Sequence, residues 1–285
     1  MATGILGSGF GIYGYLPSLA RTEDVVFILE RTRSKIECRA ELIDFRNQIQ
    51  YVDSLTGLLG QVDKLVIALP PKIQGKILTE NNLVGKKLFL EKPLGENIEE
   101  HLNLLNLLGQ RKLSFKVAYL FLYTEWVDRI AGSAGKKYKI NWIVPRSDSA
   151  WKLNLISEFG VESYYGMHFY PIYKYLGIPS TDLRICDTVE TMRITDRESR
   201  IEVNIQVGHS HKFEVCALED GEWSKIYSAK SPFGEIPKSG FTDPRVEFLS
   251  RYLSNTDKII SEATSYEIEE YVLQCRAIKR NSGTN

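Results

Sequence analysis

A glycine-rich loop that directly follows a short apolar strand constrains the fold of this chain more than any other feature. Residues 3–6, TGIL, have the composition of a strand, and the stretch GSGFGIYG follows at 7–14. Gly7 allows a tight turn, and Gly9 allows backbone N–H groups to approach a pyrophosphate at the positive end of a helix. This order of strand, glycine turn and helix predicts a dinucleotide site.

The third position of this glycine pattern departs from the usual fingerprint. Ile12 stands where a glycine or alanine normally lets the helix pack closely on the strand. Gly11 and Gly14 flank Ile12, and we expect them to supply the clearance instead. A glycine-rich turn without a ligand is the alternative interpretation.

The end of the second expected strand bears on the choice of cofactor. Glu30 lies 23 residues after Gly7, near the spacing at which an acidic side chain holds the ribose 2′-hydroxyl of NAD. Arg31 and Arg33 follow, and a guanidinium there would hold the 2′-phosphate of NADP. The sequence therefore predicts NAD or NADP and leaves the choice open.

Short apolar runs alternate with amphipathic stretches over the first half of the chain. Beyond the first strand, strand-like runs lie at 25–29, 49–52, 64–69, 87–91 and 114–120. Residues 97–110 place Ile98, Leu102, Leu105 and Leu108 at helical spacing. Alternating strands and helices predict an α/β fold, in which residues 1–120 form a Rossmann domain with a doubly wound parallel sheet.

The pattern changes in the second half of the chain. Residues 160–177 are typical of a helix, 200–208 and 211–218 alternate like strands, and 219–227 is typical of a hairpin. These segments predict an α+β domain over 121–285 with a largely antiparallel sheet that is open on one face. A closing helix is expected at 265–280, and it could pack back on the Rossmann domain.

Composition excludes several functional classes. Lys and Arg together number 36, as do Asp and Glu, so no net charge favours nucleic acid or an anionic membrane. The four cysteines form no Cys-x-x-Cys pair, and His209 and His211 have no evident third ligand, so we expect no metal site. We expect no signal peptide and no membrane helix, and hence a cytoplasmic protein.

Several segments, in order, resemble one known family. They are GSGFGIYGYLPSL at the start, VIALPP at 66–71, GKKLFLEKPL at 85–94, AYLF at 118–121 and a later Gly-x-His. The chain resembles the Gfo/Idh/MocA family of NAD(P)-dependent oxidoreductases. This resemblance implies hydride transfer between the nicotinamide and a carbinol or carbonyl carbon of a sugar, cyclitol or nucleotide-linked sugar. It also implies a homodimer or homotetramer formed through the open face of the second sheet.

Lys92 is the first expected catalytic residue. It follows a parallel strand, and ligands of doubly wound sheets bind beyond the carboxyl ends of the strands. Pro93 disfavours the helical region for Lys92 and keeps it extended. A lysine beside the nicotinamide could polarise the substrate oxygen or pass a proton. A surface lysine beside a loop proline is the alternative.

The second expected catalytic element is YYGMH at 164–168. The family resemblance implies Asp-x-Gly-x-His here, and Tyr164 stands in the place of the aspartate. On a helix, Tyr164 and His168 would share a face and point at one substrate. An imidazole suits general acid–base work, and a phenol more readily donates a proton than accepts one. A buried core histidine is the alternative for His168.

The full set of expected site residues follows from the motifs and the resemblance together. The cofactor is expected to contact Gly7, Gly9, Phe10, Gly11, Ile12, Glu30, Arg31, Arg33, Leu69, Pro70, Pro71, Glu91, Lys92 and Pro93. The substrate is expected to contact Lys92, Tyr119, Tyr123, Trp151, Lys152, Tyr164 and His168.

Two other functions compete with dehydrogenation of a carbinol. Because Tyr164 replaces the usual aspartate, the chain could be a non-catalytic regulatory protein that binds NAD(P). It could also reduce an unsaturated or imine-like bond, as relatives that resemble biliverdin reductase do, since such a reaction needs less proton machinery.

Overall fold

The protein is described from a computed structural model, which covers residues 2–23, 25–133, 136–146, 149–235, 242–254 and 262–282. The chain divides into two compact units. Unit 1 consists of Met1–Gly95, Glu100–Ala118 and Pro237–Ser265, and unit 2 consists of Glu96–Glu99, Tyr119–Ile236 and Tyr266–Asn285.

Unit 1 is built on a parallel sheet of six strands in the order β3-β2-β1-β4-β5-β6. The strands are β1 (Thr3–Leu6), β2 (Val26–Leu29), β3 (Ile49–Val52), β4 (Lys64–Ile67), β5 (Lys87–Leu90) and β6 (Ser114–Val117). Most of their side chains are buried, as expected for a parallel sheet that helices cover on both faces. This is the doubly wound order of a Rossmann domain, so the expected fold class is confirmed.

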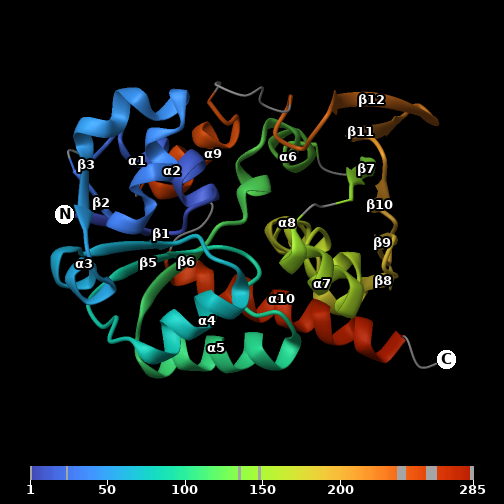
Figure 1. The fold of residues 1–285 in the computed structure, drawn as a ribbon. Helices are drawn as coiled ribbons and strands as arrows, with labels where there is room; N and C mark the ends of the chain where they lie inside the picture. Colours follow the sequence, from blue (N-terminus) through green and yellow to red (C-terminus); the bar gives the residue numbers. More distant parts are fainter. Residues whose placement is uncertain are drawn as a thin grey trace. The chain divides into compact units, whose positions relative to one another are not determined.

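Helices connect these strands. The helical segments of the region are η1 (Gly11–Tyr15), α1 (Leu16–Leu19), η2 (Glu30–Thr32), α2 (Arg33–Glu37), η3 (Ala40–Gln48), α3 (Leu55–Gln61), α4 (Pro71–Glu80) and α5 (Ile98–Gln110). Figure 1 shows α4 and α5 on one side of the sheet and α1 on the other. Of the predicted apolar face of α5, Leu105 and Leu108 are buried but Leu102 is 47% exposed, and His101 and Leu104 complete the buried face instead.

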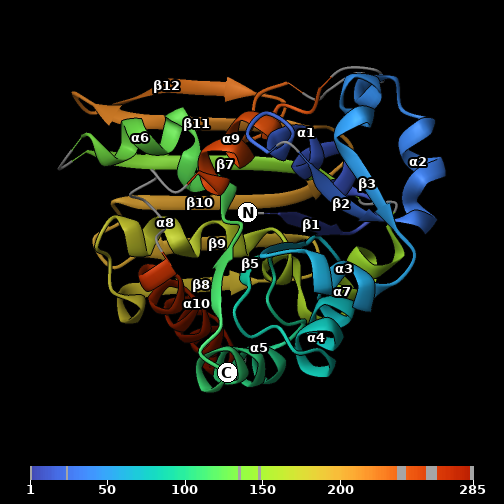
Figure 2. The same ribbon diagram turned by 90° about the vertical axis from the view of Figure 1, so that its left-hand side faces the viewer.

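A late segment of the chain returns to unit 1. Helix α9 (Arg245–Leu253) lies beside α1, as Figures 1 and 2 both show. The Ser18 hydroxyl donates to the carbonyl of Val246 at 3.0 Å, and the Tyr252 phenol donates to the carbonyl of Lys116 at 2.9 Å. The expected boundary, with all of 121–285 in the second domain, therefore differs from the observed division, because α9 buries its apolar face in unit 1.

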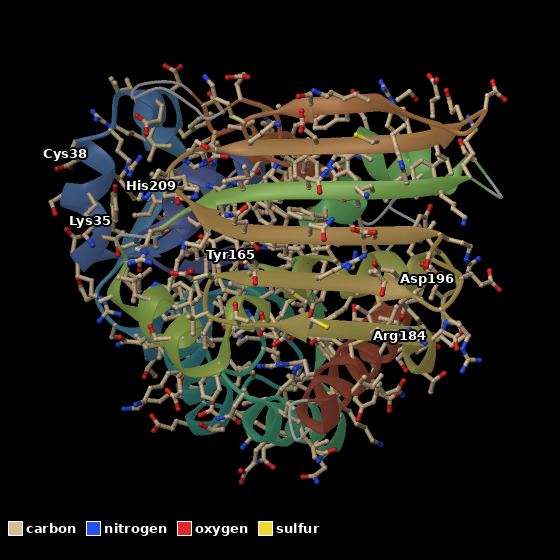
Figure 3. The ribbon with its side chains drawn as sticks, turned by 90° about the vertical axis from the view of Figure 1, so that its right-hand side faces the viewer. Lys35, Cys38, Tyr165, Arg184, Asp196 and His209 are labelled. Carbon is tan, nitrogen blue, oxygen red and sulfur yellow. The ribbon has the colours of Figure 1, made fainter. Side chains whose placement is uncertain are left out.

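Unit 2 contains a second sheet of six strands in the order β12-β11-β7-β10-β9-β8. The strands are β7 (Lys137–Pro145), β8 (Leu183–Asp187), β9 (Thr191–Asp196), β10 (Ile201–Gly208), β11 (Lys212–Glu219) and β12 (Glu222–Ala229). Only β7 and β10 pair in parallel, so the predicted largely antiparallel sheet is confirmed. Buried and accessible residues alternate along the inner strands, and Figure 3 looks onto the accessible face, where Arg184 extends from β8.

The predicted helix over 160–177 is wrong. Helix α7 (Ala150–Phe159) ends at Gly160, whose φ of +83° suits glycine. Two single turns, η5 (Val161–Ser163) and η6 (Gly166–His168), precede α8 (Tyr170–Tyr175), which has a proline in its first turn. A Cβ atom at Gly160 would meet the Asp187 carboxylate, and the φ of +83° also requires glycine there, whereas a Cβ atom at Gly166 would meet only the flexible end of the Met192 side chain.

The remaining helices of unit 2 are η4 (Leu120–Tyr123), α6 (Glu125–Ala131), η7 (Ser180–Asp182) and α10 (Glu262–Ser282). From Tyr266 onward, α10 groups with unit 2 rather than with the Rossmann unit. The Tyr271 phenol donates to the carbonyl of Ile178 at 2.7 Å, and the Ser180 hydroxyl donates to Gln274 at 2.7 Å. None of the helices in the described ranges is long and apolar enough to cross a membrane.

Candidate active site

The glycine loop lies at the carboxyl end of β1. Gly7 has a φ of +138°, and a Cβ atom there would overlap the carbonyl oxygen of Ala68, which follows β4. Both the backbone conformation and the contact therefore require glycine. Gly9 is exposed, and a Cβ atom on it would meet nothing within 4 Å, so the backbone of the loop is open to a ligand.

The clearance expected from Gly11 and Gly14 is present. A Cβ atom on Gly11 would lie 3.1 Å from Ile5 of β1 and 3.3 Å from the side chain of Ala68. A Cβ atom on Gly14 would overlap the Phe10 ring. Ile12 is 0% exposed. Its side chain therefore belongs to the core, and Gly11 provides the close approach of helix to strand.

The acidic residue at the end of β2 is paired with one of the arginines. The guanidinium of Arg33 donates to both oxygens of Glu30 at 2.6 and 2.9 Å, and it lies 3.9 Å from the centre of the Tyr51 ring. The hydrogen bonds from Arg33 hold the pKa of the Glu30 carboxyl below its usual range. Arg31 is exposed. Lys35, which the sequence did not indicate, donates to Ser8 in the glycine loop at 2.8 Å.

Three expected cofactor residues lead into α4. Leu69 and Pro70 are half-buried, and Pro71 is the first residue of the helix. β4 pairs with β1, so this segment and the glycine loop leave the sheet at the same edge.

Lys92 lies at that edge as well, because β5 pairs with β4 and ends at Leu90. Lys92 is only 7% exposed, which is unusual for lysine. Its neighbour Glu91 accepts a hydrogen bond of 2.8 Å from the phenol of Tyr15, at the end of η1. Burial raises the pKa of this phenol, and the nearby Glu91 carboxylate raises it further. This burial argues against the alternative that Lys92 is an ordinary surface lysine.

In unit 2, His168 stacks on an aromatic ring. Its imidazole lies parallel to Phe121, with ring centres 4.2 Å apart and planes at 13°. Trp142 approaches the imidazole edge-on at 6.2 Å. His168 is partly exposed, so it is not a fully buried core histidine.

Tyr164 belongs to the same aromatic group but not to the same helical face as His168. Its ring centre lies 5.5 Å from Trp151 and 4.9 Å from Tyr165, and Tyr165 contacts Trp142 at 5.2 Å. The ammonium of Lys152 lies 4.7 Å above the Tyr164 ring. The structure therefore brings Trp151, Lys152, Tyr164 and His168 into one cluster through ring contacts, without the predicted helix.

Tyr119 and Tyr123 are fully buried in unit 2. Burial raises the pKa of the Tyr119 phenol well above its usual range, and Glu269 of α10 raises it further. This burial describes packed interior positions rather than the lining of an open pocket.

A buried ion pair in unit 2 was not indicated by the sequence. The Nε atom of Arg276 lies 3.7 Å from Glu162 Oε1, and both side chains are 3% exposed. Arg276 also donates to the carbonyl of Glu96 at 2.9 Å and to that of Asn97 at 3.4 Å. Among the described residues, no group of three or more His, Cys, Asp or Glu could hold a metal ion.

Comparison with known proteins identifies the glycine-loop region. Residues 1–119 match the sequence model of a family described as an oxidoreductase family with an NAD-binding Rossmann fold. The first 119 residues belong to the Gfo/Idh/MocA oxidoreductase family. An uncharacterized oxidoreductase of Synechocystis sp. is 26% identical over 156 residues, which cover 50% of this chain and 41% of that protein.

Solved structures of similar fold cover almost all of both chains. The WlbA dehydrogenase of Thermus thermophilus, in complex with NAD and UDP-GlcNAcA, is 13% identical with a TM-score of 0.67, over 98% of this chain and 94% of that chain. A 3-ketoreductase from Actinomadura kijaniata, in complex with TDP-benzene and NADP, is 14% identical with a TM-score of 0.63, over 98% and 96%. At these identities the likeness shows a shared fold.

Unit 1 fits the cofactor named in the description of the Gfo/Idh/MocA family. The backbone at Gly9 is open enough to accept a pyrophosphate. A side chain on Gly7 would overlap the carbonyl oxygen of Ala68. The side of the loop where a ribose would lie has one carboxylate, from Glu30, and two cations, from Arg33 and Lys35. These residues suit either form of the dinucleotide.

Proposed function

We propose that this protein is an NAD(P)-dependent oxidoreductase that transfers hydride between the nicotinamide and a carbinol or carbonyl carbon of a sugar, cyclitol or nucleotide-linked sugar. The observation that carries the proposal is the nearly buried Lys92 at the sheet edge that also bears the glycine loop. An ammonium group removed from water interacts more strongly with a substrate oxygen than an exposed one does.

The proposal gives each candidate residue a role. The bound nicotinamide supplies or accepts the hydride. Lys92 donates a hydrogen bond to the substrate oxygen and stabilises negative charge on it. His168, whose ring orientation is fixed by Phe121, acts as general acid or base, because an imidazole titrates near neutrality.

The cluster of Trp151, Lys152 and Tyr164 supports a nucleotide-linked substrate. Aromatic faces stack on bases and sugar rings, and an ammonium group balances phosphate charge. The two solved relatives described above hold UDP-GlcNAcA and TDP-benzene. We propose that Tyr164, in the place of the usual aspartate, orients the substrate or, instead of His168, donates a proton in the reductive direction.

A homodimer or homotetramer formed through the accessible face of the second sheet is part of the proposal. The exposed Trp223 of β12 lies under Lys139 of β7 at 5.0 Å, which gives that face an aromatic surface between its charged side chains. Light scattering of the purified protein would measure the mass, and a monomer at micromolar concentration would contradict this part of the proposal.

The proposed function is tested in two steps. NADH and NADPH are titrated separately while nicotinamide fluorescence is followed, because this signal comes from the cofactor itself. Turnover is then measured on UDP- and TDP-linked sugars, free sugars, cyclitols, and unsaturated or imine compounds. Binding with turnover of a carbinol or ketosugar is the expected outcome.

A Lys92→Met variant tests the assigned role. Methionine nearly preserves the shape of lysine and removes the charge, so we expect kcat to fall by about 100-fold or more. Lys76→Met is the matched control, because Lys76 is an exposed residue of α4 that pairs only loosely with Glu80 at 3.9 Å. Full turnover in Lys92→Met would refute the role.

Other outcomes of the screen identify the competing functions. Tight cofactor binding without turnover of any compound would indicate a non-catalytic NAD(P)-binding regulator. Turnover restricted to unsaturated or imine bonds would indicate the reductase alternative. Binding of neither cofactor at near-millimolar concentration would contradict all three.

A further inference from the structure

One buried amide side chain holds the main chain on both sides of Lys92. Gln74 lies on α4 and is 0% exposed. Its Nε2 atom donates to the carbonyl of Glu91 at 2.8 Å and to the carbonyl of Pro93 at 3.4 Å. Its Oε1 atom accepts from the N–H of Glu91 at 3.0 Å. Gln74 therefore contacts three main-chain groups within the Glu-Lys-Pro segment.

These hydrogen bonds begin where the sheet stops. β5 ends at Leu90, and on the side of β4 a long bond of 3.3 Å from the Glu91 N–H to the Ile67 carbonyl continues the ladder. Beyond that point the backbone polar groups need other partners, because an unpaired polar group in a buried site is costly. A side-chain amide has a donor and an acceptor side by side, so it can replace a neighbouring strand here.

A second contact restrains the same segment. The Tyr15 phenol donates to the Glu91 carboxylate at 2.8 Å, and Tyr15 ends the π-helical turn that begins at Gly11. The Glu91 side chain is thus held by one element and its main chain by another. Lys92, between Glu91 and Pro93, has little freedom at its backbone.

We propose that Gln74 is a positioning residue, which fixes the backbone of residues 91–93 and thereby the place from which the Lys92 side chain extends. The predicted effect on turnover rests on the proposed function of Lys92. The predicted effect on the mobility of Lys92 rests only on the hydrogen bonds. The two effects are measured separately, so that failure of one proposal is distinguishable from failure of the other.

Gln74→Met removes all three hydrogen bonds and keeps a similar volume. The first readout is the rate at which acetic anhydride labels Lys92 in the cofactor-free protein, measured by peptide mass spectrometry and normalised to the exposed Lys76. Each of these hydrogen bonds contributes a modest free energy to holding the segment closed. Their combined loss should therefore raise the normalised labelling rate of Lys92 about tenfold. The second readout is turnover, in which kcat should fall about 10- to 100-fold while the KM for the cofactor stays within about threefold.

Gln74→Glu supplies a readout that a general loss of stability would not give. A protonated carboxyl can accept from the Glu91 N–H and donate to a carbonyl, as the amide does, whereas an ionised one faces two carbonyl oxygens without a proton to donate. The labelling rate of this variant is therefore compared with the wild type at the same pH, and we expect the ratio of the two rates to be higher at high pH than at low pH. Wild-type labelling of this variant at every pH, together with an unchanged rate in Gln74→Met, would contradict the assigned donor role.

Gln48→Met is the matched control. Gln48 also donates from its amide to a main-chain carbonyl in unit 1, that of Ala20 at 3.1 Å, but it lies at the end of η3. This variant should leave the labelling of Lys92 and turnover unchanged. If Lys92 labelling in Gln74→Met equals that in Gln48→Met, the positioning proposal is wrong, whatever the turnover. If labelling rises but Lys92→Met retains full turnover, the positioning proposal stands and the catalytic role of Lys92 is refuted.

Discussion

Replacement of Arg276 tests the buried ion pair that ties α10 to the rest of unit 2. In Arg276→Met, the Glu162 carboxylate stays in a site where its side chain is 3% exposed, and it loses the cation 3.7 Å away. Removal of one partner of a buried pair costs about 3–5 kcal/mol. With a urea m-value of about 2–3 kcal/mol/M, the unfolding midpoint should fall by about 1–2.5 M.

The assay is urea unfolding followed by tryptophan fluorescence. All four tryptophans, Trp126, Trp142, Trp151 and Trp223, lie in unit 2, so the signal reports the unit that contains the pair. Arg197→Met is the control, because Arg197 pairs with Asp182 at 4.0 Å on the surface of the same unit. An exposed pair of this kind contributes at most about 1 kcal/mol.

A double variant separates the ion pair from loss of packing. Glu162→Gln, Arg276→Met should regain about 2 kcal/mol relative to Arg276→Met, because the Glu162 carboxylate is then no longer buried without this cation. The reasoning would be refuted if Arg276→Met unfolded at the same urea concentration as Arg197→Met, or if the two substitutions were simply additive.

Two more outcomes follow from the cofactor region. Gly7→Ala should weaken NADH and NADPH binding at least about tenfold, because the new Cβ atom meets the Ala68 carbonyl and the backbone is strained at a φ of +138°; unchanged dissociation constants in fluorescence titrations would argue against the loop. Arg33→Ala should lower the preference for NADPH over NADH by about tenfold, and Glu30→Ala should raise it, because a guanidinium favours the 2′-phosphate and a carboxylate the free 2′-hydroxyl. Equal changes for both cofactors would show that the Glu30–Arg33 pair does not contact the ribose.

The sequence predicted the strands of the Rossmann sheet well and those of the second sheet incompletely. TGIL is fully buried, and KLVI is buried from Leu65 onward, so both are short buried runs between turn residues, which is a strong local signal. β8 and β9 are only 5 and 6 residues long and carry exposed arginines, so their alternation is short. β7 alternates over 9 residues, so KYKINWIVP carries a strand signal that the predicted elements do not include.

The incorrect helix has a different cause. The segment from Gly160 to Gly177 is so rich in aromatic residues that no polar face sets a period, and its apolar density resembles a buried helix. Its structure depends on tertiary contacts, because Gly160, at a φ of +83°, packs against the Asp187 carboxylate of β8. A single sequence does not contain that information.

The candidate site was predictable to the extent that its residues are close in the chain. The glycine loop and the Lys92 segment are local motifs, and the sheet order places them at one edge. Gln74 is a single glutamine in a helix, and nothing in its neighbourhood indicates that it bonds to residues 91 and 93. The pair of Glu162 and Arg276 joins segments that are far apart in the sequence, so neither residue indicates its partner.

Because α9 belongs to unit 1, both the folding of this unit during synthesis and the solubility of truncated fragments depend on α9. During synthesis the six strands of the Rossmann sheet emerge from the ribosome well before α9 does, so unit 1 is complete only after residue 253 has been made. A fragment that ends near residue 120 would leave the Lys116 carbonyl without the Tyr252 phenol and would uncover the Phe89 ring. We therefore expect such a fragment to aggregate, and a soluble Rossmann fragment to require α9 to be joined to it by a designed linker.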